Sequence, residues 1–208
     1  MKTSPPRKYR NSEKREATKE QNRAAIEAAA WEVFCQIGLD AANVRDIVDR
    51  SGVSPGTFYN YFGTKEAIFK VLSQNVLERI RSETRAARAK ASSLEELLFV
   101  SYASYLDVLR SVDGALDFID RNQHHLRSQL YPSSAVSGLA ADLAEDVRRF
   151  VRPDAMPRGD RILISSIIIA AGAEAVFHVG RKPRMMKHLR EFLPKLILKG
   201  LQGWQSGL

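Results

Sequence analysis

Four outward-facing polar side chains within residues 43–70 could form hydrogen bonds to a nucleic acid. A threonine methyl can contact thymine, an asparagine amide can pair with adenine, and tyrosine hydroxyls can bind phosphates. Phe58 and Phe62 lie four residues apart in the same segment, so they share a helix face that is expected to pack inward. The residues left facing outward are Thr57, Tyr59, Asn60 and Tyr61. The alternative is an ordinary helical hairpin with a polar surface, although such a hairpin has no need for these side chains.

The residues around this segment are typical of two short helices that are joined by a tight turn. Asn43 is a good N-cap, and Asp46 is placed to complete a capping box with it. Gly52 is expected to end the first helix, because glycine adopts the left-handed conformation at little cost. Ser54 caps the second helix, and Pro55 takes its first position, where the missing N–H is not needed.

Apolar residues repeat at helical spacing on both sides of this turn, and Thr64 begins a third helix directly behind it. The apolar positions are Val44, Ile47 and Val48 before the turn, and Ala67, Ile68, Val71 and Leu72 after Thr64. Together with the caps, this pattern predicts a helix-turn-helix whose second helix enters the DNA major groove.

The remaining chain also reads as helices, and no segment alternates with the period of a strand, so we predict an all-α fold. We expect a flexible basic arm or solvated tail over residues 1–18, a DNA-binding domain over 19–72 and a helical domain over 73–208. The expected helices cover Lys19–Ile37, the two short helices, a helix from Thr64 toward Ala89, and then Leu94–Leu109, Gly114–Leu130, Ser134–Val151, Arg158–Val179 and Pro183–Trp204.

The segment Gln21–Leu72 resembles the DNA-binding domain of TetR-family transcriptional regulators. The similarity is carried by D-I-V-x-R-S-G-V-S-x-G-T-F-Y-x-Y-F-x-T-K-E-x-I. Val48 and Ser51 stand where the family usually has alanine. Beyond Leu72 the resemblance is architectural, because the C-terminal half of the family varies greatly.

The resemblance implies a set of DNA contacts. Contacts to base edges are expected from Arg45, Thr57 and Asn60, with Pro55 and Gly56 close to the bases. Glycine has no side chain, which lets the backbone approach the groove. Contacts to phosphates are expected from Asn43, Tyr59, Tyr61 and Lys65.

The resemblance also implies that the last two helices form a four-helix bundle with a second subunit. The helix Arg158–Val179 is apolar around nearly its whole circumference, which is typical of a helix buried on all sides. The expected interface residues are Ile168, Ala171, Leu189, Leu193 and Leu196. Burial of these residues within one subunit is the alternative.

A third implication is an effector pocket enclosed by the middle helices, for a hydrophobic or amphipathic small molecule. The candidate lining residues are Tyr102, Tyr105, Leu109, Phe118, His124, His125 and Phe177. An ordinary core position is the alternative for each of the aromatic residues.

Two further features concern metal and charge chemistry. Asp117, Asp120, His124 and His125 form a metal-like cluster, in which Asp120 and His124 are one helical turn apart. The surrounding run is polar throughout, so a solvated helix face is favoured and no metal is predicted. Glu174 is acidic within an apolar helix, and pairing with a basic residue is its favoured role.

The whole chain excludes several other classes. The net charge of +8 fits a polyanionic partner, but the excess is not concentrated in residues 1–80. Cys35 is the sole cysteine, so it is taken as a buried apolar residue in a reducing cytoplasm, with redox sensing as the alternative. The apolar stretch Ile162–Ala173 is considered too short to span a membrane. There is no catalytic motif and no cofactor is predicted.

We therefore predict a cytoplasmic transcription regulator that is not an enzyme. It would be a repressor that binds a palindromic operator in double-stranded DNA as a homodimer and is released by a small-molecule effector. The alternatives are a constitutive architectural or activating DNA-binding protein without an effector, and a helical enzyme or carrier that borrowed this DNA-binding domain.

Overall fold

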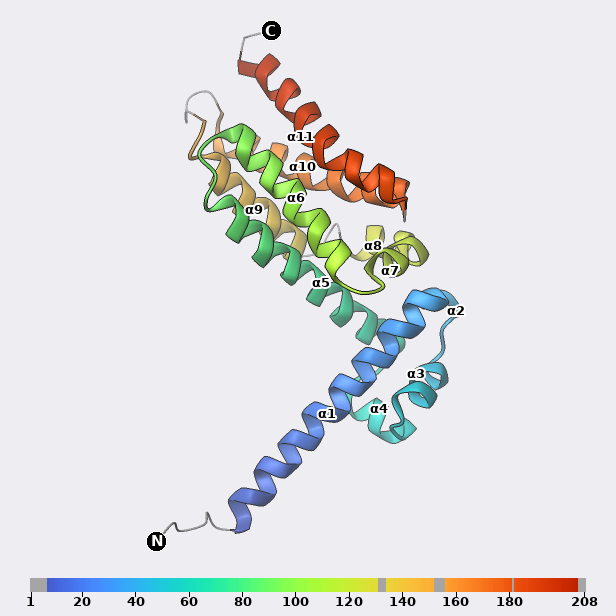
Figure 1. Cartoon of the computed structure of the whole chain (residues 1–208). Helices are drawn as coiled ribbons and strands as arrows, with labels where there is room; N and C mark the ends of the chain where they lie inside the picture. Colours follow the sequence, from blue (N-terminus) through green and yellow to red (C-terminus); the bar gives the residue numbers. More distant parts are fainter. Residues whose placement is uncertain (1–6, 131–133, 152–155, 181, 206–208) are drawn as a thin grey trace. The chain divides into compact units, whose positions relative to one another are not determined.

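The computed structural model describes residues 7–130, 134–151, 156–180 and 182–205, and within these ranges it contains helices, turns and bends but no strand (Figure 1). The predicted all-α class is therefore confirmed. The helices are α1 (Arg7–Gln36), α2 (Gly38–Ala41), α3 (Val44–Ser51), α4 (Pro55–Tyr61), α5 (Lys65–Arg88), α6 (Leu94–Ser111), α7 (Ala115–Arg121), α8 (Gln123–Leu130), α9 (Ser134–Val147), α10 (Arg158–Val179) and α11 (Pro183–Gln205).

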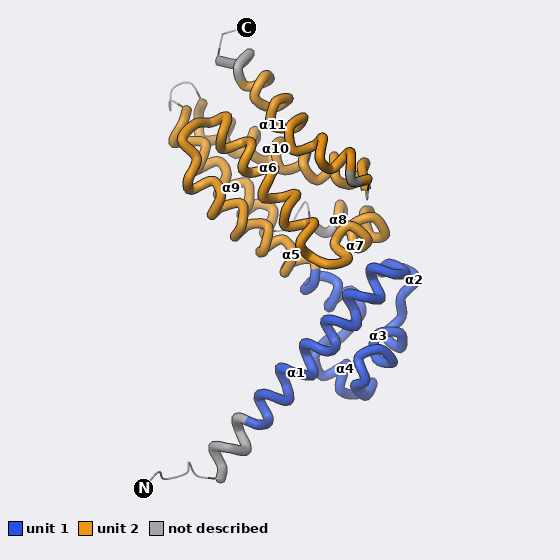
Figure 2. Tube along the Cα trace, viewed as in Figure 1, with its two compact units in different colours: residues 1–72 blue, residues 73–208 orange. Residues whose placement is uncertain are grey.

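The chain divides into two compact units, residues 1–72 and residues 73–208 (Figure 2). The division falls within α5, so this helix contributes its first eight residues to the N-terminal unit and the remainder to the C-terminal unit. Helix α5 therefore has residues in both units.

The N-terminal unit is built around α1, which packs against α3 and α2. Its core consists of side chains that are fully buried, and the rings of Phe34 and Phe69 meet edge to face with their centroids 5.4 Å apart. This geometry suits the quadrupoles of two aromatic rings. The buried large side chains are Ile26, Phe34, Leu39, Ile47, Phe58, Ile68 and Phe69.

The first helix is longer than predicted. It begins at Arg7 rather than at Lys19, so residues 7–18 are helical. Basic and acidic residues intermix over the exposed residues 14–20, and Lys19 lies 3.6 Å from Glu16 one turn away. The first six residues lie outside the described residues.

The C-terminal unit is a helical bundle in which α10 packs on α9 and α11, and α11 also packs on α6. Leu97, Leu98 and Leu106 of α6 are completely or almost completely buried in its core. Gly172 lets α6 approach α10, because an added Cβ at this position would lie 3.1 Å from the Tyr102 ring. The Tyr102 hydroxyl donates a hydrogen bond of 2.9 Å to the carbonyl oxygen of Ile168.

Two ion pairs join α5 to α9 within the C-terminal unit. Arg81 donates to both carboxylate oxygens of Asp142, at 2.6 and 3.2 Å. Arg88, whose side chain is 4% exposed, donates to Asp146 at 2.7 Å. Such charge-assisted bonds are stronger than neutral ones and fix geometry. They therefore define the register of α5 on α9.

The structure corrects the predicted helix over Gly114–Leu130. It is divided at Asn122 into α7 and α8. The buried Asn122 amide donates at 2.7 Å to the carbonyl oxygen of Phe118, and the Asn122 backbone N–H is shared between Phe118 and Ile119. An asparagine side chain that bonds to its own backbone competes with regular helix bonds, which explains the break.

Helix α10 has the bounds that the sequence predicts, Arg158–Val179. It contains an 18-residue window with a mean hydropathy of 2.0, so by length and composition alone the whole helix could cross a membrane. The predicted apolar stretch Ile162–Ala173 is only the central part of this helix. A core helix of a soluble protein passes the same test, because the requirement concerns length and composition alone.

Candidate nucleic-acid interface

Helix α3 begins with the capping box that the sequence predicts. The Asn43 side chain accepts the Asp46 N–H at 3.1 Å, and the Asp46 carboxylate accepts the Asn43 N–H at 2.8 Å. The helix ends at Gly52, which has a φ of 70° in the left-handed region. Both ends of α3 are therefore set by its own residues.

Helix α4 is capped in the same local manner. Ser54 Oγ accepts the Thr57 N–H at 3.1 Å and shares a second hydrogen bond of 2.8 Å with the Thr57 hydroxyl. Pro55 occupies the first helical position. These caps fix the start and direction of a helix that is only seven residues long.

The inner face of α4 is anchored by its aromatic residues. Phe58 is completely buried and Phe62 is 4% exposed, as predicted. Their rings lie 6.2 Å apart, and the Arg23 guanidinium of α1 lies 5.6 Å from the centre of the Phe62 ring. Because one face is fixed in the core, the orientation of the opposite face is also fixed.

The outer face of α4 carries the predicted contact residues. Tyr59 is 57% exposed, and Pro55, Gly56 and Asn60 are also exposed. Thr57 and Tyr61 are half-buried, so they lie at the borders of this face. The outer face of α4 therefore presents donors, acceptors and a methyl group on a rigid helix, as DNA readout requires.

Two predicted residues from α3 and its cap are exposed as well. The Arg45 side chain is 87% exposed, and its nearest described anion is Asp49 at 3.6 Å. An exposed ion pair of this kind contributes little and is easily exchanged for another anion. Asn43 is also exposed, although its amide oxygen is already used in the capping box.

The structure gives Lys65 a structural role. Its ammonium donates to the carbonyl oxygens of Leu39, Asp40 and Ala42, at 2.8, 3.3 and 2.7 Å. A lysine ammonium has three donors. All three are used at the end of α2, so the predicted phosphate contact would have to replace one of these bonds.

The predicted pocket residues occupy several different environments in the C-terminal unit. Tyr102 and Leu109 belong to its core, and Phe118 is 3% exposed. Burial raises the pKa of the Tyr102 hydroxyl, which therefore remains neutral. Tyr105 and Phe177 are half-buried. In this structure Tyr102, Leu109 and Phe118 therefore occupy buried core positions rather than the wall of an open pocket.

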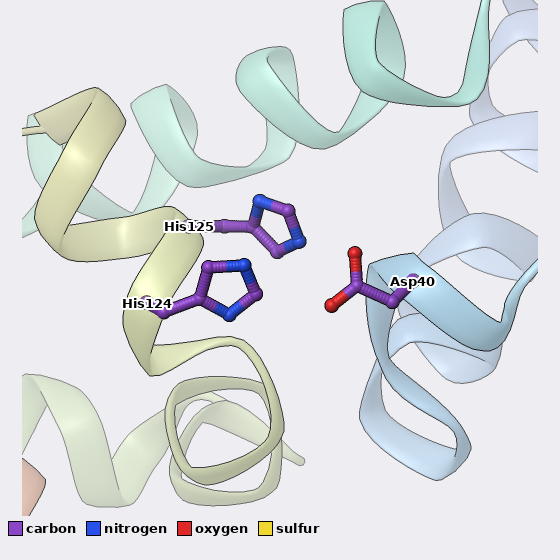
Figure 3. A group of neighbouring side chains, drawn as sticks. All are labelled: Asp40, His124 and His125. Atoms are coloured by element: carbon purple, nitrogen blue, oxygen red, sulfur yellow. The ribbon is translucent and has the colours of Figure 1, made fainter.

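The two histidines of α8 lie side by side (Figure 3). The ring centroids of His124 and His125 are 3.8 Å apart. Asp120 lies instead near Gly180, 3.8 Å from the position of an added Cβ there. Asp40, which Figure 3 also labels, belongs to α2 in the N-terminal unit.

Three of the predicted dimer contacts are corrected by their burial within the chain. Ile168, Leu189 and Leu193 are 3–5% exposed and belong to the core of the C-terminal unit. Ala171 is half-buried, whereas Leu196 is 53% exposed. The exposed large apolar side chains on α10 and α11 are Ile162, Leu163, Ile167, Met185, Phe192 and Leu196.

Glu174 pairs with a basic residue, as the sequence favoured. Arg127 of α8 donates from Nε and Nη2 to the two Glu174 carboxylate oxygens, at 3.0 and 2.8 Å. The Arg127 guanidinium also lies 4.4 Å from the centre of the Phe177 ring. The sequence singled out Glu174 and Phe177 but not Arg127, which is one of many exposed arginines and has no distinctive spacing.

Comparison with known proteins supports the interpretation that the N-terminal unit binds nucleic acid. Residues 26–72 match the family model described as bacterial regulatory proteins, tetR family. An uncharacterized helix-turn-helix transcriptional regulator, YvdT of Bacillus subtilis, is 45% identical over 49 residues, which cover 24% of this chain and 25% of YvdT. The transcriptional activator FasR of Mycolicibacterium smegmatis is 25% identical over 112 residues, covering 54% of this chain and 51% of FasR.

The match therefore spans between a quarter and about half of these two relatives. A solved structure resembles more of the chain: the transcriptional regulator FadR of Bacillus subtilis in complex with stearoyl-CoA, with a TM-score of 0.68 and 19% identity. The similarity covers 86% of this chain and 98% of that one. At this identity the similarity shows that the two chains share a fold.

Proposed function

We propose that this chain, a member of the TetR family through its N-terminal domain, is a ligand-responsive transcriptional repressor. It would bind a palindromic operator as a homodimer and leave the operator when an amphipathic small molecule binds the C-terminal unit. The observation that carries the proposal is the exposed face of α4, which a buried opposite face and the N-terminal cap at Ser54 hold in place.

In this proposal Asn60, Thr57 and Arg45 read base edges, and Gly56 lies at the closest approach to the groove. An added Cβ at Gly56 would meet Ser54 Oγ at 4.0 Å and no nearer atom, so the fold itself does not require glycine there. Close approach of DNA supplies the reason. Tyr59, Tyr61 and Asn43 contact phosphates, which set the register without reading sequence.

The dimer is proposed to form through the exposed apolar side chains of α10 and α11. Leu163 is 61% exposed and Ile167 is 52% exposed on α10, and Leu196 is 53% exposed on α11. The two helices pack against each other, so these side chains belong to one pair of neighbouring helices. A second copy would cover them, and isologous dimers are the commonest oligomers.

The dimer can be tested at Leu163, because a highly exposed side chain can be changed without disturbing the core. Leu163→Glu is expected to yield a folded monomer by light scattering after gel filtration. Ile37→Glu is the control, since Ile37 is also exposed, at 45%, but lies on the N-terminal unit. If Leu163→Glu remained dimeric, the proposed interface would be incorrect.

The ligand is proposed to be a long-chain acyl compound, prompted by the FadR structure with stearoyl-CoA. The rings of Tyr102 and Tyr105 on α6 lie against Gly172 of α10. Displacement of these rings would admit a chain between α6 and α10, with Leu109, Phe118 and Phe177 as further walls. His124 and His125 would lie on the α8 side of the bound molecule.

Ligand binding would reach DNA through α5. The ion pairs Arg81–Asp142 and Arg88–Asp146 tie this helix to α9, and α9 packs on α10. A shift of α10 would therefore be passed to α5, whose first residues belong to the DNA-binding unit. The ligand favours one of two states, and by reciprocity the operator weakens ligand binding by the same factor.

The deciding experiment is a selection on randomised duplex DNA at near-physiological salt, followed by sequencing. An enriched palindrome would support a dimeric reader and supply a probe for titrations with stearoyl-CoA by fluorescence anisotropy. Salt-sensitive bulk binding without enrichment would overturn the proposed sequence-specific function. Tighter operator binding on addition of the acyl compound would replace repression by ligand-dependent activation.

A further inference from the structure

Glu174, Gln123 and Phe177, all among the described residues, contact the Arg127 guanidinium on α8. Its Nε and Nη2 atoms donate to Glu174, and its Nη1 atom donates at 3.1 Å to the side-chain oxygen of Gln123, one turn earlier on α8. The face of the guanidinium lies over Phe177, 4.4 Å from the ring centre. Arginine in this arrangement combines cation–π stacking with bidentate binding of a carboxylate.

Stability alone is a weak reason for this ion pair. The Arg127 and Glu174 side chains are 40% and 49% exposed, and ion pairs at such positions contribute little to folding. Glu174 is also the sole acidic residue of α10 after Asp160 in its first turn. The pair therefore calls for a role in addition to packing α8 against α10.

The guanidinium would keep its position without Glu174. Gln123 holds one end of the group and Phe177 supports its face, so the Nε–Nη2 edge would remain directed at the position of the carboxylate. This edge matches the spacing of two carboxylate oxygens. Removal of Glu174 would thus leave a preorganised receptor for another carboxylate, next to an aromatic ring.

We propose that Arg127 binds the head group of an aliphatic carboxylic acid, and that Glu174 occupies this position until the ligand arrives. The inference rests on the ligand-responsive function proposed above, and it specifies a free aliphatic carboxylate as the ligand in place of a thioester such as stearoyl-CoA, which has no carboxylate for Arg127 to bind. Exchange of Glu174 for the ligand releases α10 from α8, while the aliphatic chain packs along Phe177. The exchange breaks the ion pair between Arg127 and Glu174 and forms an equivalent ion pair between Arg127 and the ligand.

The experiment measures the binding of laurate and of its uncharged methyl ester to the full chain by isothermal titration calorimetry. Glu174→Gln is expected to bind laurate about twofold to fivefold more tightly than the parent, because the competing carboxylate is gone. Arg127→Gln is expected to bind laurate at least about tenfold more weakly. Neither substitution should change the affinity for the ester.

Asp107→Asn is the matched control, since Asp107 forms an ion pair of 2.6 Å with Arg190 between α6 and α11, with the two side chains 54% and 35% exposed. It should leave laurate affinity unchanged. Equal weakening by Glu174→Gln and Arg127→Gln would overturn the proposal, because it would indicate a purely structural pair. Failure of both the parent and Glu174→Gln to bind laurate would also overturn it.

Operator release is measured separately, which distinguishes this inference from the proposed function. If laurate affinity follows the expected order but laurate does not alter operator binding, the carboxylate site is supported and the regulatory function is not. If laurate releases the operator from the parent and from Arg127→Gln at equal concentrations, the regulatory function is supported and the role of Arg127 is refuted.

Discussion

Replacement of Gly56 by alanine is expected to raise the stability of the N-terminal unit while it weakens operator binding. Gly56 is the second residue of α4 and its φ is not positive, so an L-residue can adopt its backbone conformation. An added Cβ would meet only Ser54 Oγ, at the ordinary contact distance of 4.0 Å. The isolated protein therefore has both the space and the backbone geometry for alanine.

The two effects have opposite signs and can be estimated. Alanine is about 0.5–1 kcal/mol more favourable than glycine within a helix, which corresponds to an increase in Tm of about 2–8 °C for a domain of this size. An extra methyl in a close interface costs about 1–3 kcal/mol. Operator affinity should accordingly fall by about fivefold to 150-fold.

Stability is measured by calorimetry, and affinity by fluorescence anisotropy on the selected operator. Gly159→Ala is the matched control, because Gly159 is likewise the second residue of a helix, α10, and an added Cβ there meets nothing within 4 Å. It should gain stability without losing operator affinity. If Gly56→Ala bound the operator as tightly as the parent, DNA would not approach Gly56 closely. If its Tm were lower than that of the parent, the space and backbone conformation at Gly56 would not suit alanine.

Three further predictions concern single side chains. Asn60→Ala should lose about 1–3 kcal/mol of operator binding with non-specific binding unchanged, and an unchanged operator preference would exclude Asn60 as a base reader. Lys65→Met should lower the free energy of unfolding in urea by about 1–3 kcal/mol, because three carbonyl groups lose their donor; the salt dependence of DNA binding should not change, whereas a phosphate contact would reduce its slope by about one. The hydrogen bond from Arg81 lowers the pKa of Asp142. The Arg81–Asp142 pair therefore stabilises the fold fully above the ordinary pKa of a carboxyl group, and this stabilisation is lost as the pH falls through the lowered pKa of Asp142. Asp142→Asn should therefore lower stability at neutral pH and reduce the loss of stability on acidification, and parallel pH profiles of the parent and the variant would contradict this linkage.

The DNA-binding unit could be predicted in detail because its signals are local. Asn43 and Asp46 cap each other, Gly52 takes the left-handed conformation, and Ser54 caps the next helix, all within a few residues of sequence. Each of these interactions joins residues a few positions apart, so the sequence alone predicts it, and the structure confirms each of them. The role of Lys65 was missed because its partners are carbonyl groups more than twenty residues away, which no sequence pattern marks.

The C-terminal unit was predicted less accurately because its helices are too apolar for periodicity to assign a face. On α10, Ile167 is 52% exposed and its neighbour Ile168 is 3% exposed, although the two residues are chemically identical. Which one is buried is decided by the positions of α9 and α11, and so by tertiary packing. The predicted dimer contact at Ile168 failed for this reason, and the exposed face became visible only in the structure.

The break between α7 and α8 shows how one residue, Asn122, sets the position of Arg127. Asn122 ends α7 through its bond to the Phe118 carbonyl group, and α8 then starts at Gln123. The helix boundary decides where Arg127 projects, and hence that it meets Glu174 on α10. A continuous helix, as predicted, would have placed Arg127 by a different rotation, so this pairing could not follow from the sequence.

The charges on α5 explain how a small displacement in the C-terminal unit can affect the whole of that helix. Arg81 and Arg88 are two turns apart, and their partners Asp142 and Asp146 are one turn apart on α9. A slide of α5 by one turn would leave both arginines without their present partners, and Arg88 is too buried to be solvated by water. Intermediate positions are therefore unfavourable, and α5 is expected to move with α9 as one body rather than to slip along it. Under the proposed ligand-responsive function, a ligand that moves α9 or α10 would therefore move α5 as a whole, without any need for a bend within the helix.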